Sequence, residues 1–195
     1  MKKFTKKSRE ERIEEILKAA VCVFLEKGYR NATMEDIIAR TSLSKGGFYY
    51  YFKNTKEIFL AVMERYGKIN IEEIKKMVDE SLDKESFFKE LADFLFNRIL
   101  KETDEKKIYI MAVSELFYDG DYIHRLRDMR NAYIEAAIKY CCEKFKLNRE
   151  EIKRKLELLA EVFESLSIGC YLFKKEKFYV DQEDNVKKLL FDIIK

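Results

Sequence analysis

The chain has 195 residues, of which 39 are Lys or Arg and 36 are Asp or Glu, so its formal net charge is +3. With no Pro and six Gly it lacks the turn residues of an all-β fold of many hairpins, and 47% hydrophobic residues exclude disorder. No apolar run approaches the roughly 20 residues needed to cross a bilayer, and no apolar segment of a signal peptide follows the basic start. The composition predicts an all-α, folded, cytoplasmic protein.

The sequence contains no recognisable motif for catalysis or metal binding. His124 is the sole His, and the four Cys show neither a CxxC pair nor zinc-ligand spacing. The chain also lacks GxSxG, HExxH, P-loop and GxGxxG motifs. We therefore expect no enzyme, no cofactor and no metal.

Charge is distributed unevenly along the chain. Residues 1–56 hold 13 Lys and Arg against 7 Asp and Glu, whereas residues 57–195 hold 26 against 29. A basic first quarter indicates a polyanionic partner, and composition alone allows nucleic acid or membrane. The lysines within residues 1–7 fit either an arm that reaches DNA or a disordered end.

Three helices are predicted in this basic region. Ser8 begins a capping-box pattern, and apolar residues then recur at helical spacing as far as Gly28. Thr33 is a suitable N-cap for a short second helix that ends near Arg40, and Ser44 for a third helix. A short helix, a tight turn and another short helix form the helix-turn-helix pattern.

The third predicted helix opens with two glycines and continues with five aromatic residues. Gly46 and Gly47 leave its N-terminal backbone accessible to a phosphate or a base edge. Phe48 and Phe52, four residues apart, share a face and are the expected core pair. The tyrosines at positions 49–51 then have hydroxyls available for DNA.

The stretch GYRNATMEDIIARTSLSKGGFYYYFKNTKEIFL, residues 28–60, resembles the DNA-binding domain of the tetracycline-repressor (TetR) family of bacterial transcriptional regulators. The resemblance covers about the first third of the chain. It implies a helix-turn-helix DNA-binding domain over 1–54 and a helical ligand-binding and dimerisation domain over 55–195. It also implies a homodimer that releases its operator when a small ligand binds.

The resemblance also assigns DNA contacts. Thr33 becomes a phosphate-contacting cap, and Lys56 becomes a phosphate contact at the start of the fourth helix. Leu43 departs from the family pattern, because it stands where the turn often reads Gly-Val. The implied DNA-binding residues are Thr33, Ser44, Lys45, Gly46, Gly47, Tyr49, Tyr50, Tyr51 and Lys56. Tyr51 stands where the family often has His.

A fourth helix is predicted to begin at Thr55, its cap. Further helices are predicted around 87–99, 108–117 and 122–145. Residues 61–195 hold 18 of the 27 Phe and Tyr, which either line an apolar cavity or form the core of the bundle. The pocket candidates are Phe88, Phe94, Tyr109, Phe117, Tyr133 and Phe163. Arg98 and His124 are candidates for orienting a polar ligand head, and a surface position is the alternative for His124.

The last third carries a three-heptad apolar seam from Ile152 to Phe173, after a capping pattern at Asn148. Asp181 is the expected cap of a final helix. Two such helices from each of two subunits predict an isologous four-helix interface, and the alternative is packing on the protein's own core. The predicted interface residues are Ile152, Leu156, Leu159, Phe163, Leu166, Cys170, Phe173, Val186, Leu189, Leu190 and Ile193.

The sequence thus predicts a dimeric, ligand-responsive regulator, a repressor that releases a palindromic operator on double-stranded DNA when a small apolar or aromatic molecule binds. One rival is a helical module that binds anionic membranes or an acidic protein. The other is an enzyme on a helical scaffold. Neither rival explains the spacing of residues 44–56.

Overall fold

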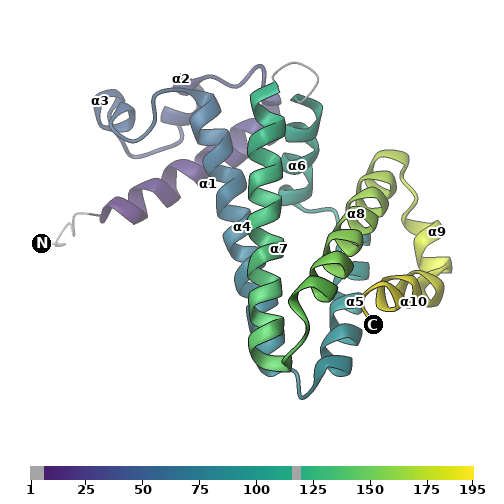
Figure 1. The fold of residues 1–195 in the computed structure, drawn as a ribbon. Helices are drawn as coiled ribbons and strands as arrows, with labels where there is room; N and C mark the ends of the chain where they lie inside the picture. The colour runs from purple at the N-terminus through teal and green to yellow at the C-terminus, as the bar shows by residue number, and fades with distance from the viewer. Residues whose placement is uncertain (1–6, 116–119) are drawn as a thin grey trace, which may run out of the picture. The chain divides into compact units, whose positions relative to one another are not determined.

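The computed structural model describes residues 7–115 and 120–195, with the backbone alone at 121–123. Throughout these residues the regular structure is helical and no strand is formed, which confirms the predicted all-α class. The helices, traced in Figure 1, are α1 (Arg9–Lys27), α2 (Met34–Ile38), α3 (Lys45–Tyr49), α4 (Thr55–Glu80), α5 (Lys84–Leu100), α6 (Asp104–Glu115), α7 (Gly120–Phe145), α8 (Arg149–Phe173), α9 (Glu176–Asp181) and α10 (Glu183–Ile194).

Packing divides the chain into two compact units. The first consists of Met1–Tyr66 and Asp104–Phe117, and the second of Gly67–Thr103 and Tyr118–Lys195. The division falls within α4 and places α6 with the N-terminal helices. The functional boundary expected between residues 54 and 55 remains a prediction.

Local sequence signals set the ends of the first helices. Ser8 caps α1 through a capping box with Glu11, and Gly28 ends the helix at φ +75°, a conformation that favours glycine. Thr33 and Ser44 are the N-caps of α2 and α3. The short helix, turn and short helix expected from the sequence are therefore present.

The core of the first unit is aromatic and aliphatic. Phe24, Phe48 and Phe59 are fully buried, and the Phe24 and Phe59 rings meet edge to face with centroids 5.0 Å apart. Arg65, in the part of α4 that belongs to this unit, donates two hydrogen bonds of 2.6 and 2.7 Å to Glu14 of α1. These contacts hold α4 against α1.

Two predicted caps require correction. Asn54, rather than Thr55, caps α4, because the Asn54 Oδ1 accepts a 2.8 Å hydrogen bond from the Glu57 N–H. Asp181 ends the short helix α9, which the sequence pattern did not predict, and α10 begins two residues later. The end of the chain thus turns through a helix of six residues before its final helix.

The second unit is built on a larger apolar core. α5 packs on both α8 and α10, and α7 packs on α8 (Figure 1). Ile99, Ile138 and Leu190 are among its fully buried residues. Burial raises the pKa of the Cys141 thiol in this core to about 12, so that Cys141 is a packing residue and not a reactive thiolate at neutral pH.

The apolar seam predicted for a dimer interface lies largely inside this core. Six of its residues are buried in their own chain: Ile152, Leu156, Leu159, Cys170, Val186 and Leu190. Phe163, Leu166 and Ile193 are partly buried against the same core, whereas Phe173 and Leu189 are exposed. The assignment is corrected for the buried residues, because a side chain covered by its own chain leaves no surface for a partner.

In the part of the chain that the structure describes, no helix combines the length and the apolar character needed to span a bilayer.

Candidate functional site

The residues predicted to contact DNA lie on or beside α2, α3 and the start of α4. Six of them are exposed: Thr33, Ser44, Lys45, Gly46, Tyr49 and Tyr50. Gly47, Tyr51 and Lys56 are partly buried. None of the nine is buried, so each retains surface that a DNA duplex can contact.

The start of α3 is arranged around Ser44. Its hydroxyl accepts a 3.2 Å hydrogen bond from the Gly47 N–H, and a Cβ at position 47 would lie only 3.2 Å from that same oxygen. Gly47 therefore leaves room for the cap. A Cβ at Gly46 would meet nothing within 4 Å, so the backbone there faces open space.

Lys45 carries the positive charge at the start of α3, and it is held by a neighbouring acid. Its Nζ lies 2.9 Å from the Glu35 Oε1 on α2, and both side chains are exposed. The hydrogen bond to Glu35 raises the pKa of the Lys45 ammonium and lowers the pKa of the Glu35 carboxyl. Any phosphate that pairs with Lys45 therefore competes with the Glu35 carboxylate.

The aromatic run divides between core and surface. Phe48 is fully buried, as predicted, whereas Phe52 is only partly buried. Tyr50 is 77% exposed, and its ring meets that of Tyr51 edge to face with centroids 5.2 Å apart. Tyr49, four residues after Lys45 and close enough to interact with its charge, is also exposed.

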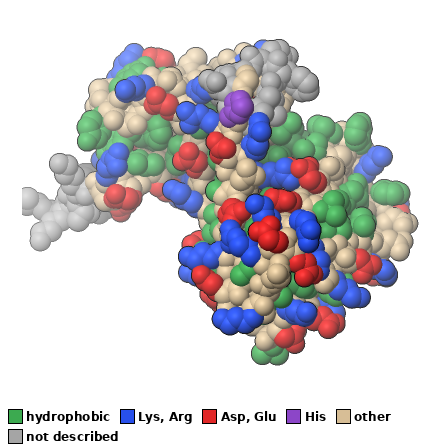
Figure 2. Space-filling model, viewed as in Figure 1, with side chains coloured by type: hydrophobic (Ala, Val, Ile, Leu, Met, Phe, Trp, Pro, Cys, Tyr) green, Lys and Arg blue, Asp and Glu red, His purple; other side chains and the backbone are tan. Residues whose placement is uncertain are grey.

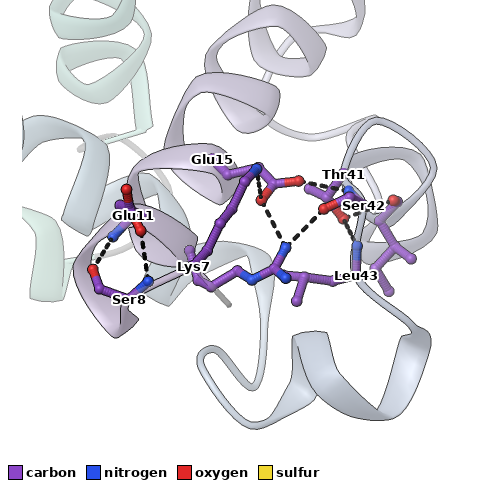
Figure 3. A network of polar contacts seen from close by, with 9 residues as sticks. Lys7, Ser8, Glu11, Glu15, Thr41, Ser42 and Leu43 are labelled. Carbon is purple, nitrogen blue, oxygen red and sulfur yellow. Dashed lines mark hydrogen bonds and ion pairs between the residues drawn. The ribbon is translucent and has the colours of Figure 1, made fainter. Parts of the chain in front are cut away.

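Glu15 of α1 holds the turn between α2 and α3 (Figure 3). Its Oε1 accepts a 2.6 Å hydrogen bond from the Ser42 N–H, and its Oε2 pairs with Lys7 and Arg12. Arg12 also donates a 2.7 Å hydrogen bond to the Ser42 hydroxyl. The hydrogen bonding at Ser42, followed by that of Lys7 and Arg12, lowers the pKa of the Glu15 carboxyl to about 2. The carboxylate is therefore ionised at neutral pH and orders the turn before α3.

A second candidate site is a cavity of about 170 Å³ within the second unit, lined by residues of α4, α5, α7 and α8. Its walls are mainly apolar and include the aromatic residues Phe87, Phe94, Tyr133 and Phe163. The polar residues Asn70, Arg98, Arg130 and Glu164 also line it. An apolar cavity with a few convergent polar groups is the usual form of a small-molecule site.

The sequence predicted part of this cavity. Phe94, Tyr133 and Phe163 line it, as does Arg98, whereas Phe88 is buried in the core. Tyr109 lies on α6 in the first unit, and Phe117 lies outside the described residues. His124 is exposed and does not line the cavity.

Sequence reasoning missed Phe87, Asn70, Arg130 and Glu164. The sequence predicts a helix around 87–99 but does not mark Phe87 as a cavity residue, because an aromatic residue at helical spacing has the same pattern in a cavity wall and in a core. The three polar residues recur one helical turn from apolar wall residues, a spacing that equally describes an exposed helical face. Among the described residues, no group of His, Cys, Asp and Glu is placed to hold a metal ion.

Comparisons with known proteins identify the first unit. The family model described as bacterial regulatory proteins, tetR family, matches residues 16–62, which include α2, α3 and their caps. Residues 16–62 of the chain belong to the tetR family of bacterial regulatory proteins. Its members and this chain's relatives are transcriptional regulators rather than enzymes, in agreement with the sequence-based prediction.

Two curated relatives show how far this TetR-family similarity extends. The chain is 33% identical over 93 residues to YfiR of Bacillus subtilis, described as an uncharacterized HTH-type transcriptional regulator, covering 48% of this chain and 43% of YfiR. It is 24% identical over 130 residues to IcaR of Staphylococcus epidermidis, a negative transcriptional regulator of a biofilm operon. This match covers 65% of this chain and 68% of IcaR. The chain therefore matches less than half the length of YfiR.

Solved structures extend the likeness of fold to nearly the whole TetR-family chain. The fatty acid degradation regulator FadR from Bacillus halodurans matches with a TM-score of 0.71 at 16% identity, covering 96% of this chain and 97% of FadR. FadR from Bacillus subtilis in complex with stearoyl-CoA matches with a TM-score of 0.65 at 16% identity, covering 93% of this chain and 99% of that FadR chain. At this identity the likeness establishes the fold alone.

Proposed function

We propose that this TetR-family chain is a ligand-responsive transcriptional repressor, which acts as a cytoplasmic homodimer on a palindromic operator. A small molecule in the cavity of the second unit releases the operator. The observation that carries the proposal is the exposed start of α3, where Ser44, Lys45 and Gly46 form a polar surface within the stretch that matches the family model.

Relatives and structural neighbours support both halves of the proposal. IcaR is described as a negative regulator, and FadR from Bacillus subtilis was solved with a small ligand. The repressor role rests on relatives such as IcaR, and the relatives do not all share it. FasR of Mycolicibacterium smegmatis, 25% identical over 115 residues, is described as an activator. The direction in which transcription from the operator changes when the chain binds it distinguishes the two roles.

The proposed dimer uses the outward face of α8. Leu158, Ser165, Gly169 and Leu172 recur at spacings of seven, four and three, which places them on one side of the helix. Leu158 and Leu172 are more than half exposed, and a Cβ at Gly169 would meet nothing within 4 Å. The small residues in the middle let a second helix approach closely, and the apolar ends supply buried area.

Further exposed apolar residues extend this surface. Phe173 at the end of α8, and Phe178 and Val180 on α9, are each more than half exposed. Figure 2 shows hydrophobic side chains gathered around the C-terminal end of α8 and the adjoining α9. We assign this surface to a second copy of the chain, because a palindromic operator requires two recognition helices related by a two-fold axis.

The DNA half is tested with duplexes selected from a random library by the 195-residue chain itself. We expect the selected sites to be palindromic and the affinity to fall steeply as salt increases. Lys45→Ala should weaken binding to all selected duplexes and reduce the salt slope by about 1, because one phosphate contact is lost. Lys139→Ala, an exposed lysine on α7, is the matched control and should bind like the wild type.

Glu35→Gln should change DNA affinity in the direction opposite to Lys45→Ala. It removes the carboxylate that pairs with Lys45, so DNA affinity should rise by up to about fivefold, the range of an exposed ion pair. Equal binding to every duplex, or unchanged binding by Lys45→Ala, would argue against α3 as the reading helix. Binding to anionic lipid vesicles that is tighter than binding to any duplex, and that weakens in Lys45→Ala, would instead favour the membrane alternative.

A further inference from the structure

Glu35 is an acidic side chain on the surface that is proposed to meet DNA. It is the second residue of α2, and its Oε1 lies 2.9 Å from the Nζ of Lys45, the first residue of α3. More than half of each side chain is exposed. A carboxylate at this place weakens DNA binding, because the phosphates of the duplex carry the same charge. The chain thus places a repulsive group beside the lysine that attracts DNA.

The Glu35 carboxylate is charged and has no hydrogen to donate. The hydrogen bond from Lys45 lowers the pKa of Glu35 below its ordinary value of 4.5, so Glu35 is ionised at neutral pH. An ionised carboxylate only accepts hydrogen bonds. Any group of the DNA that pairs with Glu35 must therefore be a hydrogen-bond donor.

Binding to DNA takes the cation away from Glu35. In the proposed function the Lys45 ammonium pairs with a phosphate, and it is then drawn from the Glu35 carboxylate. A second charged neighbour of Glu35 is Asp36, an acid whose Oδ1 pairs with the Lys27 Nζ at 2.6 Å. Glu35 is then left close to like charges of the protein and of the DNA. A donor supplied by the DNA can take the place of Lys45.

Such a donor is within reach of Glu35. A hydrogen bond joins Glu35 to Lys45, so the carboxylate lies one hydrogen-bond length from a group that contacts DNA in the proposed function. Gly46 follows Lys45, and a Cβ built there would meet nothing within 4 Å. The absence of a side chain at this position lets base edges approach the surface beside Glu35 closely.

Base edges in the major groove offer two amino donors, N4 of cytosine and N6 of adenine. Adenine N6 stands beside N7, an acceptor that repels a carboxylate, and the amide of Asn or Gln matches that pair of groups better. Cytosine N4 is the donor to which Glu and Asp side chains bind. The chemistry of Glu35 thus favours cytosine over the other three bases.

We propose that Glu35 of α2 is a specificity-determining residue, which accepts a hydrogen bond from the N4 amino group of one cytosine in each half-site of the operator. The inference rests on the proposed function, because it names a base that the DNA-binding surface selects. Any other base at that position leaves the carboxylate among phosphates without a donor, which disfavours the wrong site. At cytosine the charge-assisted hydrogen bond offsets this cost.

Selection from a random duplex library, carried out with the 195-residue wild-type chain and with Glu35→Gln, locates the position. Glutamine keeps the size of the side chain and removes its charge. The wild type should require cytosine at one position of each half-site, and Glu35→Gln should accept other bases at that position alone. Thermal unfolding of the variant checks that it keeps the fold.

Four duplexes that differ only in the base pair at this position then measure the preference at one fixed salt concentration. The wild type should bind the cytosine duplex at least about tenfold tighter than the other three, in the range of a charge-assisted hydrogen bond. In Glu35→Gln the preference should fall to about threefold or less, because the other three duplexes gain most of the rise in affinity.

Two control variants separate base reading from general electrostatics. Glu64→Gln removes an exposed carboxylate from the part of α4 in the same unit, with the same change in charge, and should keep the wild-type preference. Lys45→Ala should weaken binding to all four duplexes alike and keep the cytosine preference, because a phosphate contact carries no sequence information.

Unchanged cytosine selection by Glu35→Gln would overturn the proposal, as would loss of the preference in Glu64→Gln or in Lys45→Ala. Palindromic sites that are identical for the wild type and Glu35→Gln would overturn this inference and leave the proposed function in place. A wild-type chain that selects no duplex would refute the proposed function, and this inference with it.

Discussion

Gly67 is the residue at which the second unit begins along α4, and its missing side chain has a specific use. Glycine is unfavourable in a helix interior, but α4 continues through Gly67 without interruption. A Cβ built at position 67 would lie 1.6 Å from the Tyr133 Oη and 1.9 Å from its Cζ. Glycine is therefore present because the Tyr133 ring, a wall of the cavity, packs directly on the helix backbone.

We expect Gly67→Ala to destabilise the chain by about 1 kcal/mol, because two opposing effects differ in size. Alanine in a helix interior is favoured over glycine by about 1 kcal/mol. Displacing a packed ring costs about 1 to 3 kcal/mol, and here the hydroxyl oxygen and two ring carbons of Tyr133 lie within 2.3 Å of the new Cβ. Denaturant unfolding, read as the shift in midpoint at constant slope, measures the difference.

The control is the same substitution in a Tyr133→Ala background. Without the ring, Gly67→Ala should stabilise the chain by up to about 1 kcal/mol, so the sign of the effect reverses. The same sign in both backgrounds would show that Tyr133 is not what requires glycine at this position.

At the scale of elements, α1 is more than a capped helix in the core of the first unit. Its capping box was predictable, since Ser8 and Glu11 are three residues apart. The role of Glu15 was not, because its partner Ser42 lies 27 residues away and the contact exists only once α1 packs against the turn. This one carboxylate links α1 to the turn that precedes α3.

The lowered pKa of Glu15 predicts a pH dependence of stability. The pKa is about 2 in the folded chain against 4.5 ordinarily, so the contribution is fully present above pH 4.5 and is lost as the pH falls towards 2. A shift of this size corresponds to about 3 kcal/mol at most, and screening by solvent reduces it to about 1 kcal/mol.

Glu15→Gln isolates this contribution. The free energy of unfolding of the variant should be about 1 kcal/mol below that of the wild type at pH 7, and the gap should narrow between pH 4.5 and pH 2. Chemical denaturation at several pH values measures it. A gap that stays constant with pH would mean that the ionised carboxylate is not what holds the turn.

At the scale of the whole molecule, the two faces of α8 decide how the chain associates. The heptad pattern of Ile152, Leu156 and Leu159 is equally suited to a partner helix and to the chain's own core. In the structure α5, α7 and α10 cover that face, so the surface left for a second copy carries Leu158 and Leu172. The dimer remains a proposal, now on a different face.

Leu172→Glu should convert the chain to a monomer, because the carboxylate would be buried in the proposed interface without a partner. Sedimentation equilibrium should show a dimer dissociation constant raised at least tenfold, and operator affinity should fall with it. Leu82→Glu is the matched control, since Leu82 is 93% exposed between α4 and α5. A dimer that persists in Leu172→Glu but dissociates in another surface variant would relocate the interface.

The sequence by itself determined what depends on neighbours along the chain. The all-α class, the caps Ser8, Thr33, Ser44 and Asn148, and the order of residues that resembles the TetR family all rest on contacts within three or four residues. Such signals are readable because helix caps and helical periodicity are local properties.

Only the tertiary structure decided which face of each helix is inside. It placed Leu156 and Leu190 in the core, Tyr109 in the first unit and Phe94, Tyr133 and Phe163 around a cavity. An apolar residue at helical spacing carries the same pattern whether it faces its own core, a ligand or a partner. The choice depends on contacts between segments far apart in the sequence, such as Gly67 with Tyr133, and these exist only in the folded chain.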